Sequence, residues 1–115
     1  MEAFRASRPL LYARWDDAAL AHATAGVTER HLAARQGYFA GVALDASSTR
    51  AALKNLTAPV LLYAGDLDPM VAPALVRQAA PLFNDATVVV QPGAAHFPWI
   101  DDPAAFAAAV RSFLG

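Results

Sequence analysis

The stretch from residue 59 to residue 69, PVLLYAGDLDP, decides the fold class of this chain. Its first part is a continuous apolar run of strand length, which follows Pro59 and ends at Gly65. Runs of this kind are typical of strands buried on both faces of a parallel sheet. Two carboxylates, Asp66 and Asp68, follow at once. We therefore expect a buried strand with an acidic loop at its carboxyl end.

A second buried strand is expected at residues 87–91, TVVVQ, which Pro92 and Gly93 close. Between the two strands, Pro73 can begin a helix that Pro81 would end or bend. A strand, a helix and a second strand in this order predict a right-handed crossover and a parallel pair. The predicted fold class is therefore α/β.

Residues 102–115, DPAAFAAAVRSFLG, have the pattern of a complete final helix. An aspartate at the cap, a proline in the first turn and a glycine at the end are typical helix signals. We expect Asp102 to cap this helix. We assign Asp101 to the same role, because a second carboxylate there interacts favourably with the helix dipole.

Residues 1–56 are predicted to be helical, because their apolar residues recur at near-helical spacing between capping residues. We expect three helices: one capped by Asp16 or Asp17, one from Thr28 to near Gly37, and one over residues 49–56 capped by Ser47, Ser48 and Thr49.

Composition excludes several classes of function. The chain has no cysteine, so it has no disulfide framework, thiolate metal site or cysteine nucleophile. Its net charge of −1, without a basic cluster, gives no footprint for nucleic acid or anionic lipid. Charges, prolines or glycines interrupt every stretch of about 18 residues, and the N-terminus lacks a signal-peptide core. We expect a soluble, cytoplasmic protein that binds neither nucleic acid nor membrane.

Two groups suited to proton transfer are expected where the strands end. Asp68 follows the first strand and His96 follows the second. Adjacent parallel strands lie about 4.8 Å apart, so both loops open on the same edge of the sheet. There a carboxylate can orient an imidazole and stabilise its protonated form, while the other ring nitrogen takes a proton from a hydroxyl. The pattern favours the base and orienting acid of a nucleophilic triad.

A metal site is the other interpretation of the acidic loop, since Asp66 and Asp68 form a D-x-D pair. No second carboxylate cluster and no histidine lies at ligand spacing from this pair. We therefore interpret Asp66 as a solvated loop residue, and we expect neither a metal nor another cofactor.

The remaining histidines and the aromatic residues beside His96 are interpreted as packing groups. His22 and His31 lie in helical stretches and are expected to be ordinary surface or half-buried residues. Phe97 and Trp99 are expected to wedge the histidine loop against the sheet, with contact to a substrate as the alternative for both.

The two loops, PVLLYAGDLDP and VVVQPGAAHFPWIDDPAAFAAAVRSFL, together resemble the C-terminal part of an α/β-hydrolase. The specific resemblance covers residues 57–115, while residues 1–56 resemble more loosely the helical lid that such enzymes insert before the acid-bearing strand. It implies a partial α/β-hydrolase fold in which Asp68 is the triad acid and His96 the base. The order of acid and then histidine agrees with that of the family.

The chain departs from the family pattern at the nucleophile. No Gly-x-Ser-x-Gly elbow occurs, no Gly-x-Asp-x-Gly replaces it, and the serines are Ser7, Ser47, Ser48 and Ser112. The oxyanion-hole loop is also missing, because in the family it belongs to strands that would precede residue 1. The first strand would then lack its natural neighbour in the sheet. Its apolar edge would then be covered by residues 1–56, by another copy or by a separate chain.

Two functions of different classes follow. In the first, the chain belongs to a hydrolase of ester, amide or related acyl bonds in small molecules. The serine then comes from an upstream reading frame, from a region excluded by a mis-assigned start codon, or from a partner polypeptide. In the second, it is a non-catalytic truncated relative, either a dimerising or binding module or a gene remnant. In both cases we expect the chain alone to be inactive.

Overall fold

The computed structural model describes residues 6–41 and 45–115, in which helices come first and strands alternate with helices afterwards. The elements are η1 (Arg8–Leu11), α2 (Asp17–Thr28), α3 (Leu32–Ala40), α4 (Ala46–Asn55), β1 (Val60–Gly65), α5 (Pro73–Ala79), η2 (Ala80–Leu82), β2 (Ala86–Gln91), α6 (Pro98–Asp101) and α7 (Pro103–Leu114).

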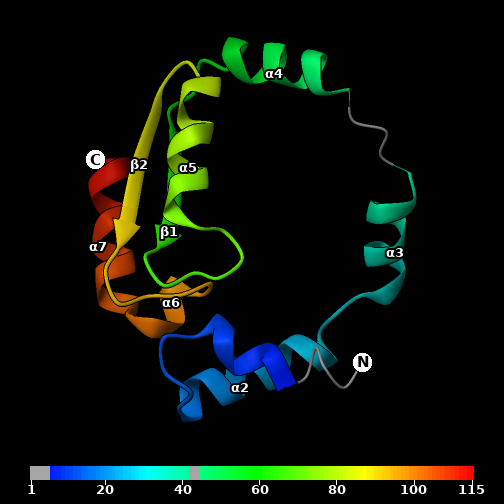
Figure 1. Cartoon of the computed structure of the whole chain (residues 1–115), viewed down its shortest axis with the longest axis vertical. Coiled ribbons are helices and arrows are strands. Elements are labelled where there is room, and N and C mark those ends of the chain that lie inside the picture. The colour runs from blue at the N-terminus through cyan, green and yellow to red at the C-terminus, as the bar shows by residue number, and fades with distance from the viewer. Residues whose placement is uncertain (1–5, 42–44) are drawn as a thin grey trace.

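The two strands form a parallel sheet, as the sequence predicts. Their register runs from Val60 opposite Ala86 to Gly65 opposite Gln91. Figure 1 shows α5 and α7 on opposite sides of this sheet, with α6 at the carboxyl ends of the strands. Both site loops therefore leave the sheet at the same edge, and the α/β fold class is confirmed.

Burial of the strands differs from the prediction. Most residues of β1 and β2 are half-buried, and full burial is confined to the carboxyl ends, at Ala64, Gly65 and Gln91. The sheet formed by the described residues has two strands, so β1 has a hydrogen-bonded neighbour on one edge alone. The most buried part of the sheet is therefore the edge where the two loops meet, where Ala94 and Ala95 are also buried. Other buried apolar residues include Tyr12, Ala19 and Val76.

The N-terminal helices form an arc that runs from the α6 end of the sheet round to its other end (Figure 1). The radius of gyration is 16.3 Å, against about 13 Å for a compact domain of this length. The accessible surface is 8100 Å², against about 6000 Å² for a compact protein of this mass. The chain thus exposes about a third more surface than a self-contained domain.

Two of the three N-terminal helices differ from the prediction in their bounds and in the residues that cap them. Helix α2 begins after Asp16, whose carboxylate accepts the Ala19 N–H, as predicted. The second helix does not begin at Thr28, because α2 continues through that residue. Helix α3 begins after His31, whose ring accepts the Ala34 N–H, and it continues past Gly37.

The cap of α4 is Asp45 instead of the predicted serines and threonine. The Asp45 carboxylate accepts the Ser48 N–H at 2.7 Å and the Ser47 hydroxyl at 3.0 Å. An ionised carboxylate makes a stronger hydrogen bond than a hydroxyl, so the helix begins three residues earlier than expected, at Ala46.

The C-terminal helices follow the sequence signals closely. Pro73 begins α5, and Pro81 lies in η2, where the α-helix has already ended. Asp102 caps α7 by accepting the Ala105 N–H at 3.0 Å. The prediction for Asp101 is wrong, since this residue ends the short helix α6 and is buried.

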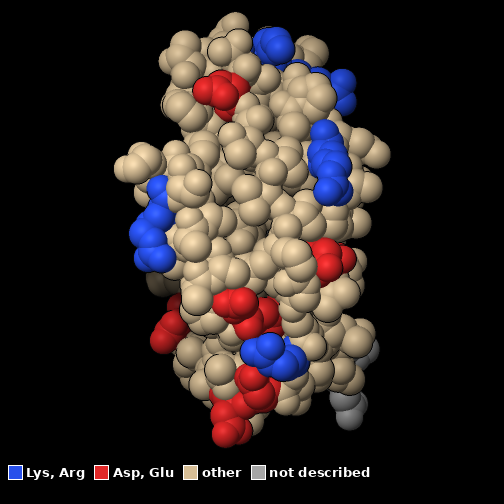
Figure 2. Space-filling view, turned by 90° about the vertical axis from the view of Figure 1, so that its left-hand side faces the viewer, with Lys and Arg blue, Asp and Glu red and all other residues tan. Residues whose placement is uncertain are grey.

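Charged side chains are sparse on the face of the molecule beside β2 and α7. Figure 2 shows this face largely uncharged, with most acidic side chains toward the end where α6 and α2 lie and most basic ones toward the other. Within residues 6–41 and 45–115, no helix is long and apolar enough to cross a membrane.

Candidate functional site

Asp68 lies in the loop after β1, where the backbone wraps around its carboxylate. One oxygen, Oδ1, accepts the N–H groups of Met70 at 2.8 Å and Val71 at 3.1 Å. These bonds hold the carboxyl group in one orientation. The second oxygen, Oδ2, is left to face the histidine loop.

The structure brings Asp68 and His96 together, 28 residues apart in sequence. His96 Nδ1 lies 2.9 Å from Asp68 Oδ2, and the Asp68 side chain is 6% exposed. Burial raises the pKa of Asp68, but the hydrogen bonds from His96 and from the N–H groups of Val71 and Met70 outweigh it and lower the pKa below its ordinary value. Asp68 is therefore ionised at neutral pH, and His96 Nδ1–H must be the donor.

The second nitrogen of the His96 ring is available to an external group. Within the described residues Nε2 has no hydrogen-bond partner. Every buried side-chain nitrogen or oxygen in that part of the chain does have a partner, so Nε2 is not buried. Nε2 must therefore reach solvent. With Nδ1–H donating to Asp68, the neutral ring presents Nε2 as an acceptor of protons.

Gly65 sets how closely the acid and histidine loops approach. A Cβ atom on Gly65 would lie 2.2 Å from the Ala94 carbonyl oxygen and 2.3 Å from that of Ala95. The main chain before His96 thus rests directly on the end of β1. Gly93, whose φ is 67°, makes the turn into this loop, and its N–H donates to Asp66.

The buried side chain of Gln91 joins the end of β2 to the helices that follow. Its oxygen accepts the Tyr63 hydroxyl, and its nitrogen donates to the carbonyls of Pro98 at 3.2 Å and Asp102 at 3.5 Å. This network fixes α6 below the histidine loop. The sequence offers no signal for it beyond a polar residue in an apolar strand.

The N-terminal segment packs on the histidine loop through aromatic rings. Phe97 lies 4.9 Å from Tyr12 and 4.7 Å from His22, between ring centroids, and the Tyr12 hydroxyl lies 2.8 Å from His22 Nδ1. Tyr12 is buried, and burial raises its pKa, with Arg8 acting in the opposite direction. The prediction for Phe97 is wrong in its partner, because the ring packs on Tyr12 and His22 of the N-terminal segment instead of wedging the loop against the sheet. Trp99 remains 42% exposed.

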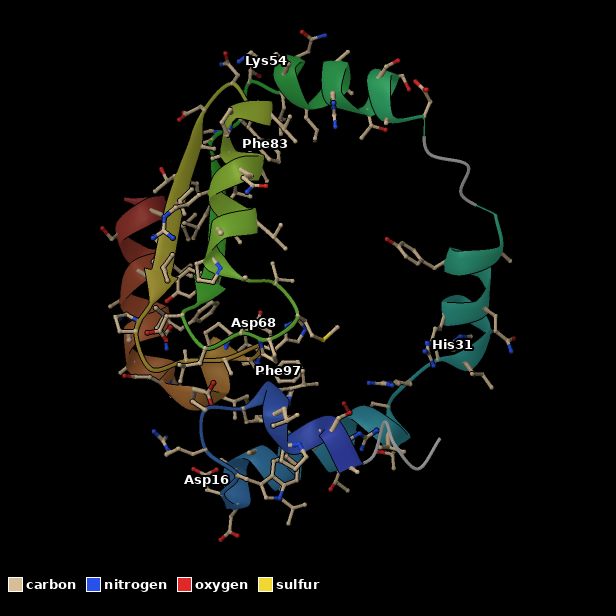
Figure 3. The ribbon with its side chains drawn as sticks, viewed as in Figure 1. Asp16, His31, Lys54, Asp68, Phe83 and Phe97 are labelled. Carbon is tan, nitrogen blue, oxygen red and sulfur yellow. The ribbon has the colours of Figure 1, made fainter. Side chains whose placement is uncertain are left out.

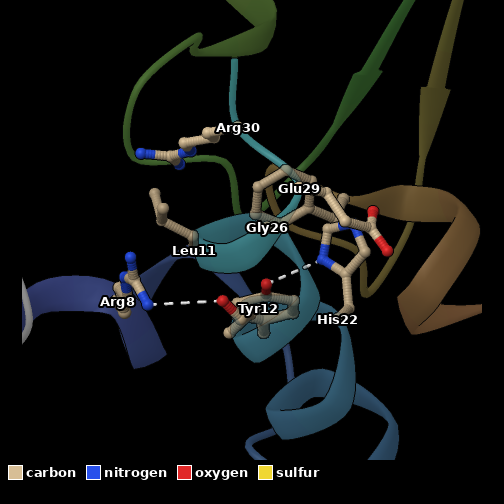
Figure 4. Close-up of a pocket in the computed structure, with 9 residues that line it drawn as sticks. Arg8, Leu11, Tyr12, His22, Gly26, Glu29 and Arg30 are labelled. Atoms are coloured by element: carbon tan, nitrogen blue, oxygen red, sulfur yellow. Dashed lines mark hydrogen bonds between the residues drawn. The ribbon is translucent and has the colours of Figure 1, made fainter. Parts of the chain in front are cut away.

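Two hollows are lined by residues of the histidine loop and its neighbours. One, of about 170 Å³, is lined by Asp68 and His96 together with Val71, Trp99 and Phe106. The other, of about 290 Å³, lies between η1 and α2 and is lined by Tyr12, His22 and Phe97 with the cations of Arg8 and Arg30 (Figure 4). Figure 3 places Asp68 and Phe97 at the same end of the sheet, whereas His31 and Lys54 lie on the arc.

A profile of the alpha/beta hydrolase family matches residues 1–109 of this chain. The chain belongs to the alpha/beta hydrolase family. The match includes the helical residues before the strands as well as the two loops. None of the curated proteins with which the chain was compared matches it.

In this alpha/beta hydrolase the predicted site residues meet, while the serines lie elsewhere. Within the described residues no serine hydroxyl is hydrogen-bonded to His96, and none lines the hollow beside it. Ser47 and Ser48 lie on α4 and Ser112 on α7, all exposed. Across residues 6–41 and 45–115, no three potential metal ligands cluster.

Proposed function

We propose that this chain supplies the acid Asp68 and the base His96 of a serine hydrolase of ester, amide or related acyl bonds. The observation that carries the proposal is the 2.9 Å contact between His96 Nδ1 and Asp68 Oδ2, with Nε2 open to solvent. Membership of the alpha/beta hydrolase family supports the reaction class.

The chemistry assigned to these residues is proton transfer at Nε2. His96 accepts the serine proton as the hydroxyl oxygen attacks the acyl carbon, and Asp68 stays ionised and stabilises the imidazolium. The imidazolium then gives the proton to the leaving oxygen or nitrogen as its bond to the acyl carbon breaks. A water molecule, activated by the same nitrogen, releases the acid from the serine ester.

The serine belongs, in this proposal, to another polypeptide segment that pairs with β1. Among the described residues, one edge of β1 has no strand beside it, and the excess surface is about 2000 Å². Both features support such a partner, because an apolar strand edge and excess surface need cover. Residues 1–56 then act as the lid and residues 57–115 as part of the catalytic core. A small acyl compound is the expected substrate class.

The reading frames upstream of Met1 test the proposal first. A Gly-x-Ser-x-Gly elbow encoded there supports it, and an unrelated neighbouring gene contradicts it. The purified chain alone should resist labelling by a fluorophosphonate probe. Stoichiometric labelling of Ser7, Ser47, Ser48 or Ser112 would show that the nucleophile is internal.

A complementation assay then tests the roles of the two residues. Together with the elbow-bearing segment, the chain should hydrolyse a p-nitrophenyl ester, and His96→Ala should lower kcat by at least about 1000-fold. His31→Ala is the matched control, since that histidine caps α3 away from Asp68. Equal activity of the His96 variant and the control would remove His96 from the mechanism.

A second candidate function is non-catalytic association through the same edge of β1. In the part of the chain that the structure describes, β2 alone pairs with β1, which favours this candidate because an open apolar edge can pair with a second copy. Sedimentation equilibrium distinguishes the two. A stable dimer without esterase activity in any complemented mixture supports this candidate, and a monodisperse monomer contradicts it.

A further inference from the structure

Asp101 joins two segments that are far apart in sequence. Its Oδ1 accepts the Ala13 N–H at 2.9 Å and its Oδ2 accepts the Ala95 N–H at 2.8 Å. Its main-chain carbonyl also accepts the Arg14 guanidinium at 3.0 Å. One buried residue thus connects the N-terminal segment to the residue immediately before His96.

The carboxylate of Asp101 is satisfied by backbone groups instead of a cation. Asp101 is 5% exposed, and within the described residues its carboxylate forms no ion pair. A buried carboxylate is costly unless its oxygens are hydrogen-bonded, so the two N–H groups are needed where they lie. An asparagine offers a single acceptor oxygen and would direct its NH₂ at the other donor. The site is therefore specific for a carboxylate.

The same two segments are bonded a second time at His96 itself. The His96 N–H donates to the Leu11 carbonyl at 3.0 Å. Of two consecutive N–H groups, that of Ala95 is held by Asp101 and that of His96 by the N-terminal segment. On the opposite side the loop rests on Gly65, with no room for a Cβ atom. The main chain that carries the imidazole is held between these two surfaces.

We propose that Asp101 is a positioning residue that holds the histidine loop and residues 11–14 together, so that docking of the N-terminal segment sets the geometry between His96 and Asp68. The inference rests on the proposed role of His96 as base. A shift of the loop by about 1 Å would lengthen the 2.9 Å contact beyond hydrogen-bonding distance.

Nuclear magnetic resonance of the 115-residue chain tests this without substrate or serine. The readout is the low-field signal of the His96 Nδ1 proton shared with Asp68 and its exchange with water. In Asp101→Asn the signal should disappear or exchange at least about tenfold faster. In the matched control Asp102→Asn, whose amide oxygen can still accept the Ala105 N–H and which contacts neither Ala13 nor Ala95, exchange should stay within about twofold of wild type.

A folded Asp101→Asn chain with wild-type exchange of the His96 proton overturns the inference. If this variant does not fold, Arg14→Ala decides the matter, because it removes the side-chain donor to the Asp101 carbonyl and, besides this, only an exposed ion pair with Asp16 at 3.5 Å. About threefold faster exchange in Arg14→Ala supports the inference, and unchanged exchange overturns it. Because the readout needs no catalysis, failure of the esterase assay and failure of this test are distinguishable.

Discussion

Two regions of this chain fold in different ways. One is the edge of the sheet where the strands end, and the other is the pair of helices α3 and α4. At the edge, Gly65, Gln91, Ala94, Ala95 and Asp101 are buried. In α3 every side chain that the structure describes is exposed, and in α4 only Thr49 and Leu53 are half-buried. Helices α3 and α4 nevertheless begin at side-chain caps, His31 and Asp45. The difference shows that local signals suffice to form a helix here, whereas tertiary contacts concentrate at the candidate site.

Gly65→Ala should show this contrast most strongly. The added Cβ would collide with the carbonyls of Ala94 and Ala95, so the histidine loop must move. We expect a loss of about 3 kcal/mol in the free energy of unfolding, and loss of the low-field His96 signal. Denaturant unfolding measures the first effect.

The matched variant is Gly37→Ala in α3, where no atom lies within 4 Å of the added Cβ. Helix propensity alone should then raise the free energy of unfolding by about 0.5–1 kcal/mol. Equal effects of the two glycine variants would abolish the distinction between the regions.

Asp68→Asn should lower the free energy of unfolding at neutral pH by about 2 kcal/mol, because it removes a charged acceptor of three hydrogen bonds. The pKa of Asp68 is lowered on folding. Its contribution to the free energy of unfolding is therefore complete above the ordinary pKa of about 3.9, which holds in the unfolded chain, and is lost as the pH falls through the pKa of the folded protein. The wild-type and variant curves should therefore converge in acid. Asp66→Asn is the control, because Asp66 lies in the same loop but is exposed. If the curves of the wild type and of Asp68→Asn stayed parallel in acid, the assigned role of the Asp68 carboxylate in stability would be wrong.

Tyr12→Phe should lower the free energy of unfolding by about 1 kcal/mol, because it removes the hydroxyl bonded to His22 while keeping the ring against Phe97. The pKa of Tyr12 is raised by burial, so its contribution is complete below the ordinary value of about 10 and falls as the pH rises from there. Thermal unfolding at pH 7 and pH 11 measures both effects. Wild-type stability in the variant at both pH values would show that the hydroxyl contributes nothing.

Leu32→Ala should change the free energy of unfolding by less than about 0.5 kcal/mol, because Leu32 is 63% exposed at the start of α3. Denaturant unfolding at two protein concentrations checks this. A loss of several kcal/mol that depends on concentration would show that α3 is buried against a second molecule, and the contrast between the regions would then apply to the isolated chain alone.

What the sequence predicts correctly lies within short windows. The apolar runs of β1 and β2, the prolines around α5 and the caps Asp16 and Asp102 each act on their own neighbours. The contact between Asp68 and His96 belongs to this group too, because the strand ends bring their loops together, while the catalytic roles of the two residues stay a prediction. Competition between neighbouring caps is harder to resolve, as Asp45 shows beside Ser47 and Ser48.

The remaining features depend on distant partners. Asp101 has the sequence context of a helix cap, but its donors are Ala95 and, 88 residues away, Ala13. Tyr12 and His22 meet Phe97 only after the N-terminal segment has docked. The extent of strand burial depends on neighbours that the described residues do not supply. No local pattern encodes these contacts.

The separations of the bonds around His96 also give an order of folding. The bond to Asp68 closes a loop of 28 residues, whereas the bond from Ala13 to Asp101 spans 88. By loop-closure entropy alone the longer contact costs about 1 kcal/mol more to form. We therefore expect the acid and base to meet within the strand-helix-strand unit while the N-terminus is still free, and residues 11–14 to dock in a later step.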